Sequence, residues 1–342
     1  MPTSTFAFST SEEYFPAARR ELVDEFGQRA TVERLGPDIG ALTLRDGSLQ
    51  ELAEACRTRP IAFVKHLTEE IARIPLKEAA DLDAVVRGAL AAVPRDLPRG
   101  PLAVQAWVSG QNPLEFGSAD LFRALSEALE KQGFSAVRSG AAFVLSAFIT
   151  PSGVLLGLGN PADGLSDWPG GRVRLARSPR TISRAEFKLE EALKVFDLTL
   201  PRSGTAVDLG ASPGGWTRIL RTQGLKVWAV DPGDLDARLL SDPGVQHART
   251  TAGNFFGTNK ARFDVVVNDM KMDPKLTCDI MLTAAGRLRP GGTAVVTLKL
   301  AHGNVADAVR SCLGQLRRKY DIRHARQLHH NRHEITVVAE RH

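Results

Sequence analysis

The stretch AVDLGASPGGW, residues 206–216, decides the fold: an apolar strand ends in an acid and runs into a turn with a proline and three glycines. A strand that stops at glycines and restarts as a helix presents backbone N–H groups to whatever occupies the turn. The turn does not read GxGxxG, because Gly210 is followed by Ala211, Ser212 and Pro213. The stretch therefore predicts a ligand-binding turn that differs from that of a nicotinamide dinucleotide site.

Around this turn, helix-like segments alternate with short apolar strands from residue 182 to the end of the chain. The expected strands lie at 205–210, 226–231, 245–250, 263–269 and 292–300, and a final pair lies at 324–330 and 333–341. Apolar strands separated by helices predict a parallel sheet covered on both faces. We therefore expect an α/β, Rossmann-like domain over residues 179–342.

The residues before this domain have a mixed α+β pattern. Residues 1–60 predict one small unit with a helix and two strands, and residues 61–160 predict a second unit that includes two strands joined by the turn PSG. A connector rich in proline, glycine and arginine follows at 161–178. We place the main domain boundary in that connector.

Composition limits the classes of protein to consider. The chain has 342 residues, of which 43% are hydrophobic. Its longest uncharged apolar run, residues 141–149, is far shorter than the roughly 18 residues of a membrane helix, and the first residues lack a secretory signal pattern. The three cysteines have no metal-ligand spacing. We expect a cytoplasmic protein with no membrane association and no metal.

The formal charge of the chain is +5, and its basic residues are unevenly spread, with two strongly basic runs. Residues 172–184 carry five arginines and no acid, and residues 317–333 carry six Lys or Arg, four His and one acid. Either run alone could be a solvated face, but two such runs flanking one domain favour a polyanionic partner such as RNA. The candidate RNA-binding residues are Arg172, Arg174, Arg177, Arg180, Arg184, Arg323 and Arg326.

Two acids near the turn indicate which ligand it holds. Asp208 would repel a pyrophosphate but suits an ammonium group, and Asp231, about one βαβ unit further on, can accept hydrogen bonds from ribose hydroxyls. S-adenosylmethionine carries both groups. The alternative is a glycine turn that serves only helix packing. The candidate cofactor-binding residues are Asp208, Gly210, Ala211, Ser212, Pro213, Gly214, Gly215, Trp216, Asp231, Thr251, Asn254 and Asp269.

Four charged residues are expected at the rim that holds the methyl donor: Lys188, Asp269, Lys299 and Glu334. A lone lysine is usually a surface cation and a lone aspartate at a strand end is usually a cap. Two cations alternating with two carboxylates at one sheet edge are instead a candidate catalytic group.

The motifs SRAEFKLEEAL, DLGASPGGW, VVNDM, RPGGTAVVTLKL and ARQLHHNRHEITV occur in order over residues 180–340. They resemble the FtsJ-like RNA 2′-O-ribose methyltransferases, and within them the THUMP-containing enzymes that methylate a cytidine ribose of large-subunit ribosomal RNA. The resemblance implies an S-adenosylmethionine-dependent methyltransferase domain, a ferredoxin-like unit at 1–60 and a THUMP-like RNA-binding domain at 61–160. It also implies a Lys-Asp-Lys-Glu tetrad at Lys188, Asp269, Lys299 and Glu334.

A ribose 2′-hydroxyl must lose its proton as it attacks a methyl group, and a neutral lysine can accept that proton. Lys299 is the candidate general base, with Asp269 to orient it. The resemblance is weakest at Thr251, where the family usually has an acid that holds the adenine amino group; Thr251, Asn254 or the main chain could accept that bond. The alternatives are a transfer-RNA methyltransferase and an RNA-binding protein with an inactive methyltransferase domain.

Overall fold

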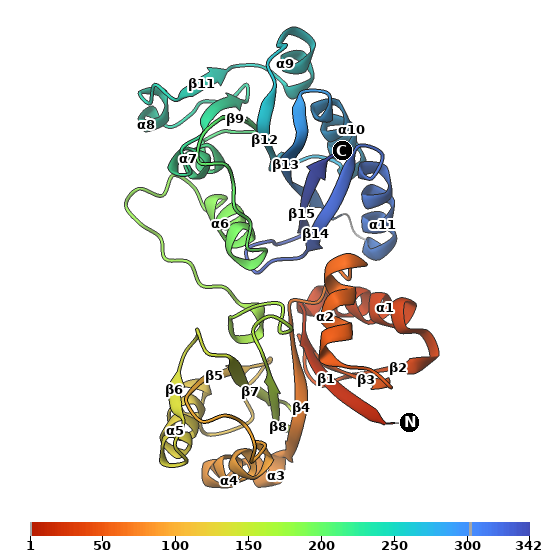
Figure 1. Ribbon diagram of the computed structural model, residues 1–342, viewed down its shortest axis with the longest axis vertical. Coiled ribbons are helices and arrows are strands. Elements are labelled where there is room, and N and C mark those ends of the chain that lie inside the picture. The colour runs from red at the N-terminus through yellow and green to blue at the C-terminus, as the bar shows by residue number, and fades with distance from the viewer. Residues whose placement is uncertain (1, 301–302) are drawn as a thin grey trace. The chain divides into compact units, whose positions relative to one another are not determined.

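The computed structural model describes residues 2–300 and 303–342. The chain divides into two compact units, Met1–Val173 and Arg174–His342, and their boundary lies within the predicted connector at 161–178. Figure 1 shows the elements of both units along the chain.

The first unit combines a long mixed sheet with short helices. Its elements are β1 (Thr3–Ser9), α1 (Phe15–Phe26), β2 (Ala30–Arg34), β3 (Ile39–Arg45), α2 (Leu49–Thr58), β4 (His66–Pro75), α3 (Leu76–Ala79), α4 (Leu82–Ala92), β5 (Pro101–Val108), α5 (Ser118–Lys131), β6 (Ser135–Val137), β7 (Phe143–Thr150) and β8 (Gly153–Gly159). The strands are hydrogen-bonded in the order β2-β3-β1-β4-β8-β7-β5-β6. Strands from both sides of residue 60 thus share one sheet, and the division of this unit into a ferredoxin-like and a THUMP-like domain stays a prediction.

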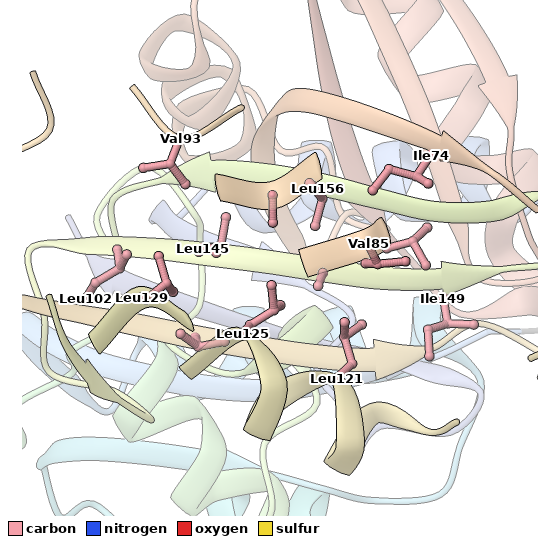
Figure 2. Packing of buried hydrophobic residues seen from close by; sticks show 14 of the residues in the cluster. Ile74, Val85, Val93, Leu102, Leu121, Leu125, Leu129, Leu145, Ile149 and Leu156 are labelled. Carbon is pink, nitrogen blue, oxygen red and sulfur yellow. The ribbon is translucent and has the colours of Figure 1, made fainter. Parts of the chain in front are cut away.

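The core of the 61–160 segment explains why α5 forms where it does. Leu121, Leu125 and Leu129 recur every four residues, so they lie on one face of the helix, and all three are fully buried. They pack against apolar side chains of β5 and β7, including Leu102 and Leu145, as Figure 2 shows. The strand pair β7–β8, predicted around the turn PSG, is an antiparallel hairpin.

The second unit is a sheet with helices on both faces. Its elements are α6 (Glu186–Val195), β9 (Thr205–Leu209), α7 (Gly215–Thr222), β10 (Lys226–Val230), α8 (Ala237–Leu240), β11 (Val245–Ala248), α9 (Ala252–Thr258), β12 (Phe263–Asn268), α10 (Pro274–Ala285), β13 (Leu288–Lys299), α11 (Val305–Leu316), β14 (Tyr320–Arg326) and β15 (Glu334–Arg341). Figure 1 shows α6 and α7 on one side of the sheet and α10 and α11 on the other.

The strand order of this sheet is β11-β10-β9-β12-β13-β15-β14. Strands β9 to β13 pair in parallel, whereas β15 runs antiparallel between β13 and β14. The strands read as continuous apolar runs because both faces are covered, and β12 is buried from Val265 to Asn268. The predicted Rossmann-like α/β fold is confirmed.

The order of the strands reverses between β9 and β12, since β10 and β11 lie on one side of β9 and β12 and β13 on the other. In open α/β sheets the ligand crevice lies outside the carboxyl ends of the strands at this reversal. Asp208 lies near the end of β9, Asp231 follows β10, and Asp269 follows β12. The acids singled out in the sequence therefore meet at one sheet edge.

Candidate active site

The structure brings the four predicted tetrad residues into contact. Nζ of Lys188 lies 3.0 Å from both carboxylate oxygens of Asp269 and 2.7 Å from Oε1 of Glu334. Nζ of Lys299 lies 2.8 Å from Oδ1 of Asp269 and also donates to Oε2 of Glu334. Each lysine therefore bridges both carboxylates in a closed ring of alternating charge.

The secondary structure explains how residues so far apart in sequence reach this ring. Lys299 and Glu334 are directly paired across the antiparallel strands β13 and β15. Asp269 follows the neighbouring strand β12, and Lys188 reaches the ring from α6. The start of α6 is fixed by Glu186, a buried carboxylate that accepts the backbone N–H of Ile182 and pairs with Arg218.

A fifth residue, Thr297, belongs to the same group and was missed in the sequence. Its hydroxyl is fully buried, donates to Oδ1 of Asp269 at 2.7 Å and accepts from Nζ of Lys299 at 2.9 Å. The available signal was its place two residues before Lys299, because alternate residues of a strand share one face. Thr297 fixes the aspartate and the lysine relative to each other.

The charges in the ring shift each other's protonation. Burial opposes the charged form of Lys188, but the carboxylates of Asp269 and Glu334 outweigh it, so the pKa of Lys188 lies above its ordinary value. Burial acts to raise the pKa of Asp269, but the positive charges of Lys299 and Lys188 more than offset it. The pKa of Asp269 therefore lies below its ordinary value. Lys188 is therefore a cation and Asp269 a carboxylate at neutral pH.

The pKa of Asp208 shifts in the opposite direction from that of Asp269. Its side chain is 1% exposed and accepts a hydrogen bond from the buried Thr217 hydroxyl at 2.7 Å. Burial raises its pKa to about 7, and the nearby charges of Asp269 and Asp231 add to the shift. A buried carboxylate among other acids is stabilised by a cationic ligand.

Asp231 is already tied to the turn. Its Oδ2 accepts the backbone N–H of Ser212 at 3.2 Å and its Oδ1 accepts that of Gly233 at 2.7 Å. The backbone N–H groups of Gly210 and Ala211 bond to the carbonyl of Val230. These N–H groups, which the sequence suggested for a ligand, hold the turn against β10.

The fold itself requires the glycines of the turn. This agrees in part with the alternative that the turn serves helix packing. Gly210 and Gly214 have positive φ values of 79° and 114°. A Cβ at Gly214 would lie 2.1 Å from the side chain of Leu239, and one at Gly210 would lie 2.4 Å from that of Met270. Pro213, between them, follows a cis peptide bond.

The remaining predicted cofactor residues lie at the starts of α7 and α9. Trp216 is buried in the core and its indole N–H donates to the carbonyl of Ala185 at 2.7 Å, so any ligand contact there is through its main chain. A Cβ at Gly215 would lie 2.4 Å from the hydroxyl of Ser183. Thr251 caps α9 by accepting the backbone N–H of Asn254, and both residues are exposed.

The predicted RNA-binding arginines fall into two groups. Arg174, Arg177, Arg180 and Arg184 are exposed on the connector and the approach to α6. The other three arginines already contact other side chains of the protein. Arg172 pairs with Asp38 of the first unit, Arg323 pairs with Glu340, and Arg326 is only 4% exposed beneath the ring of Phe196.

Burial rules out a surface phosphate contact by Arg326 in this structure. The predicted run of basic residues at 317–333 therefore divides between buried and exposed side chains. The sequence could not show this, because Arg326 lies on a strand whose face is covered by Phe196.

Across residues 2–300 and 303–342, no cluster of three or more His, Cys, Asp or Glu side chains is placed to hold a metal ion. In the same residues, no helix combines the length and apolar character needed to cross a membrane.

The strand order, the turn at the switch point and the acids at successive strand ends define a Rossmann-like methyltransferase domain. Comparison with known proteins agrees: residues 181–342 match the FtsJ-like methyltransferase family. The chain belongs to this family, among the relatives named ribosomal RNA large subunit methyltransferase M.

The relative from Halorhodospira halophila (strain DSM 244 / SL1) is 41% identical over 177 residues, which cover 51% of each chain. The match thus spans about half the length of that relative. The relative from Xylella fastidiosa (strain M12) is 33% identical over 346 residues, which cover 93% of this chain and 95% of the relative. The crystal structure of TrmN from Thermus thermophilus covers 99% of this chain with 18% identity and a TM-score of 0.41.

Proposed function

We propose that this chain transfers a methyl group from S-adenosylmethionine to the 2′-hydroxyl of a ribose in large-subunit ribosomal RNA, with a cytidine as the target. The observation that carries the proposal is the ring of Lys188, Asp269, Lys299 and Glu334 at the sheet edge that also holds the switch point of a methyltransferase fold. The names of the relatives support ribosomal RNA as the substrate.

The residues at the strand ends fit the cofactor. Asp208 would hold its ammonium group, because this buried carboxylate lies beside other acids and a cation would stabilise its charged form. Asp231 would accept hydrogen bonds from the ribose hydroxyls. Thr251 or Asn254 would contact the adenine edge. When bound, S-adenosylmethionine supplies a methyl group on a sulfonium, so the leaving group is already activated.

The tetrad supports a division of roles between its two lysines. Lys188 stays charged, because its pKa is raised by both carboxylates, and it holds Asp269 and Glu334 in place. Lys299, in its neutral form, would take the 2′-proton of the ribose, while S-adenosylmethionine would supply the methyl group and leave as the neutral thioether. Asp269 and Glu334 then stabilise the ammonium that forms on Lys299.

The exposed arginines Arg174, Arg177, Arg180 and Arg184 would contact phosphates of the RNA. These contacts carry no sequence information by themselves, so they would position the strand and leave target choice to other groups.

The purified chain, incubated with methyl-labelled S-adenosylmethionine and unmodified large-subunit ribosomal RNA, tests the proposal. Nuclease digestion should release the label as a 2′-O-methylated nucleoside, and Lys299→Ala should give none. Label on a base, or no transfer by the wild type, would contradict the proposed function.

A further inference from the structure

A buried glutamate in α6 holds the segment that leads into β15. Glu191 is 1% exposed, and its carboxylate accepts the backbone N–H groups of His329 and His330, each at 2.7 Å. The same carboxylate lies 2.7 Å from Nδ1 of His330. One carboxylate thus fixes both the main chain and the imidazole ring of His330.

This contact lies next to the tetrad. Glu191 follows Lys188 by three residues, so the two side chains share a face of α6 with a rise of about 4.5 Å between them. His330 precedes Glu334 by four residues in the opposing segment. The pairs Lys188–Glu334 and Glu191–His330 therefore link the same two segments about one helical turn apart.

The bond to Glu191 determines what His330 can offer a ligand. A carboxylate accepts hydrogen bonds, so Nδ1 of His330 carries the proton, and in the neutral ring Nε2 is an acceptor. The ring also contacts Phe187, with centroids 5.3 Å apart, and its side chain is 19% exposed. The ring is thus partly exposed, and it lies four residues before Glu334 of the proposed tetrad.

We infer that Nε2 of His330 accepts a hydrogen bond from the RNA at the target nucleotide, which makes His330 a substrate-binding residue. The donor is either the exocyclic amino group of the target base or the 2′-hydroxyl of an adjacent ribose, since both are N–H or O–H donors within a single-stranded target. This inference rests on the proposed methyl transfer to an RNA ribose.

Two substitutions separate this role from a purely structural one. His330→Asn places an amide near the position of Nδ1 and so keeps a donor for Glu191, but it has no group at the position of Nε2. His330→Gln reaches the position of Nε2 but loses the donor close to Glu191. His324→Asn, at a ring that stacks on Phe196, is the matched control.

Steady-state methylation of RNA, cofactor affinity and melting temperature are measured for all three variants. His330→Asn should raise KM for RNA about tenfold, the equivalent of one ordinary hydrogen bond, with kcat and cofactor affinity near wild type. His330→Gln should stay within about threefold of the wild-type KM. His324→Asn should keep the wild-type KM for RNA and the wild-type cofactor affinity.

Substrate variants identify the donor. If it is the base amino group, wild type should prefer a target cytidine over uridine, and His330→Asn should lose that preference. If it is the adjacent hydroxyl, a 2′-deoxy neighbour should weaken the wild type but not His330→Asn.

The inference is overturned if His330→Asn keeps the wild-type KM, or if both His330 variants lose stability and cofactor affinity together, which would make His330 an anchor only. These results are distinct from failure of the proposed function. That failure appears as absence of methyl transfer by the wild type in the same assay, and the inference would fall with it.

Discussion

Replacing Asp208 by asparagine should stabilise the protein at neutral pH and weaken cofactor binding at the same time. Asparagine keeps the shape of the side chain and an oxygen that can accept from Thr217, but it removes a charge buried among Asp269 and Asp231. The same charge is the proposed partner of the cofactor's ammonium group. Stability and function therefore make opposite demands on this position.

The size of the effect follows from the raised pKa of Asp208. Its value of about 7 in the folded protein compares with 3.8 for an ordinary aspartate, a difference equivalent to on the order of 4 kcal/mol. Because the folded state keeps the proton to higher pH than the unfolded state, this cost is absent below about pH 4, grows as the pH rises and is complete above about pH 7.

Urea unfolding of wild type and Asp208→Asn at pH 5 and at pH 8 measures this difference. The variant should gain stability relative to wild type at pH 8, and the gain should shrink by more than half at pH 5. Calorimetric titration at pH 8 should show S-adenosylmethionine binding the variant at least tenfold more weakly. A stability difference that does not change with pH would refute the electrostatic argument, and unchanged affinity would remove Asp208 from the cofactor site.

Three further substitutions test the site. Asp269→Asn leaves two lysines facing one carboxylate, which should cost on the order of 3 kcal/mol of unfolding free energy at pH 7. Folding lowers the pKa of Asp269, so at acid pH this residue is protonated in the folded and the unfolded wild type, and the denaturation curves of wild type and variant should converge there. Thr297→Val should reduce kcat about tenfold while Thr297→Ser stays near wild type, since only valine removes the hydroxyl, and equal rates would dismiss a role for it. Arg177→Ala with Arg180→Ala should flatten the salt dependence of RNA affinity by about 0.7 in log–log slope for each lost contact, whereas Arg323→Ala, already paired with Glu340, should change it less.

Much of the second unit could be predicted because its strands are short apolar runs between helices. That pattern allows few arrangements, and it predicted the parallel strands β9 to β13, the turn after β9 and the acids at the strand ends, but not that β15 runs antiparallel to β13 and β14. The tetrad followed from residue types at those ends together with the resemblance. Its members then met because Lys299 and Glu334 are paired across two strands.

Other features depend on contacts that no local pattern reports. Thr297 looks like an ordinary strand threonine until β12 places Asp269 beside it. At position 214, in addition to the positive φ, the close approach of Leu239 in α8 leaves no room for a Cβ. Arg326 reads as a surface cation, but the ring of Phe196 covers it. Each depends on which side chains the tertiary fold brings together.

The most direct test of the central claim is the single-turnover rate of methyl transfer by Lys299→Arg with RNA and S-adenosylmethionine both saturating. Arginine can keep ion pairs with Asp269 and Glu334 but cannot become neutral at accessible pH. We expect the rate to fall by about a hundredfold or more, with binding of both substrates retained and without the rise with pH that a lysine base predicts for the wild type. Transfer at nearly the wild-type rate, with the same pH dependence, would contradict the assignment of Lys299 as the general base.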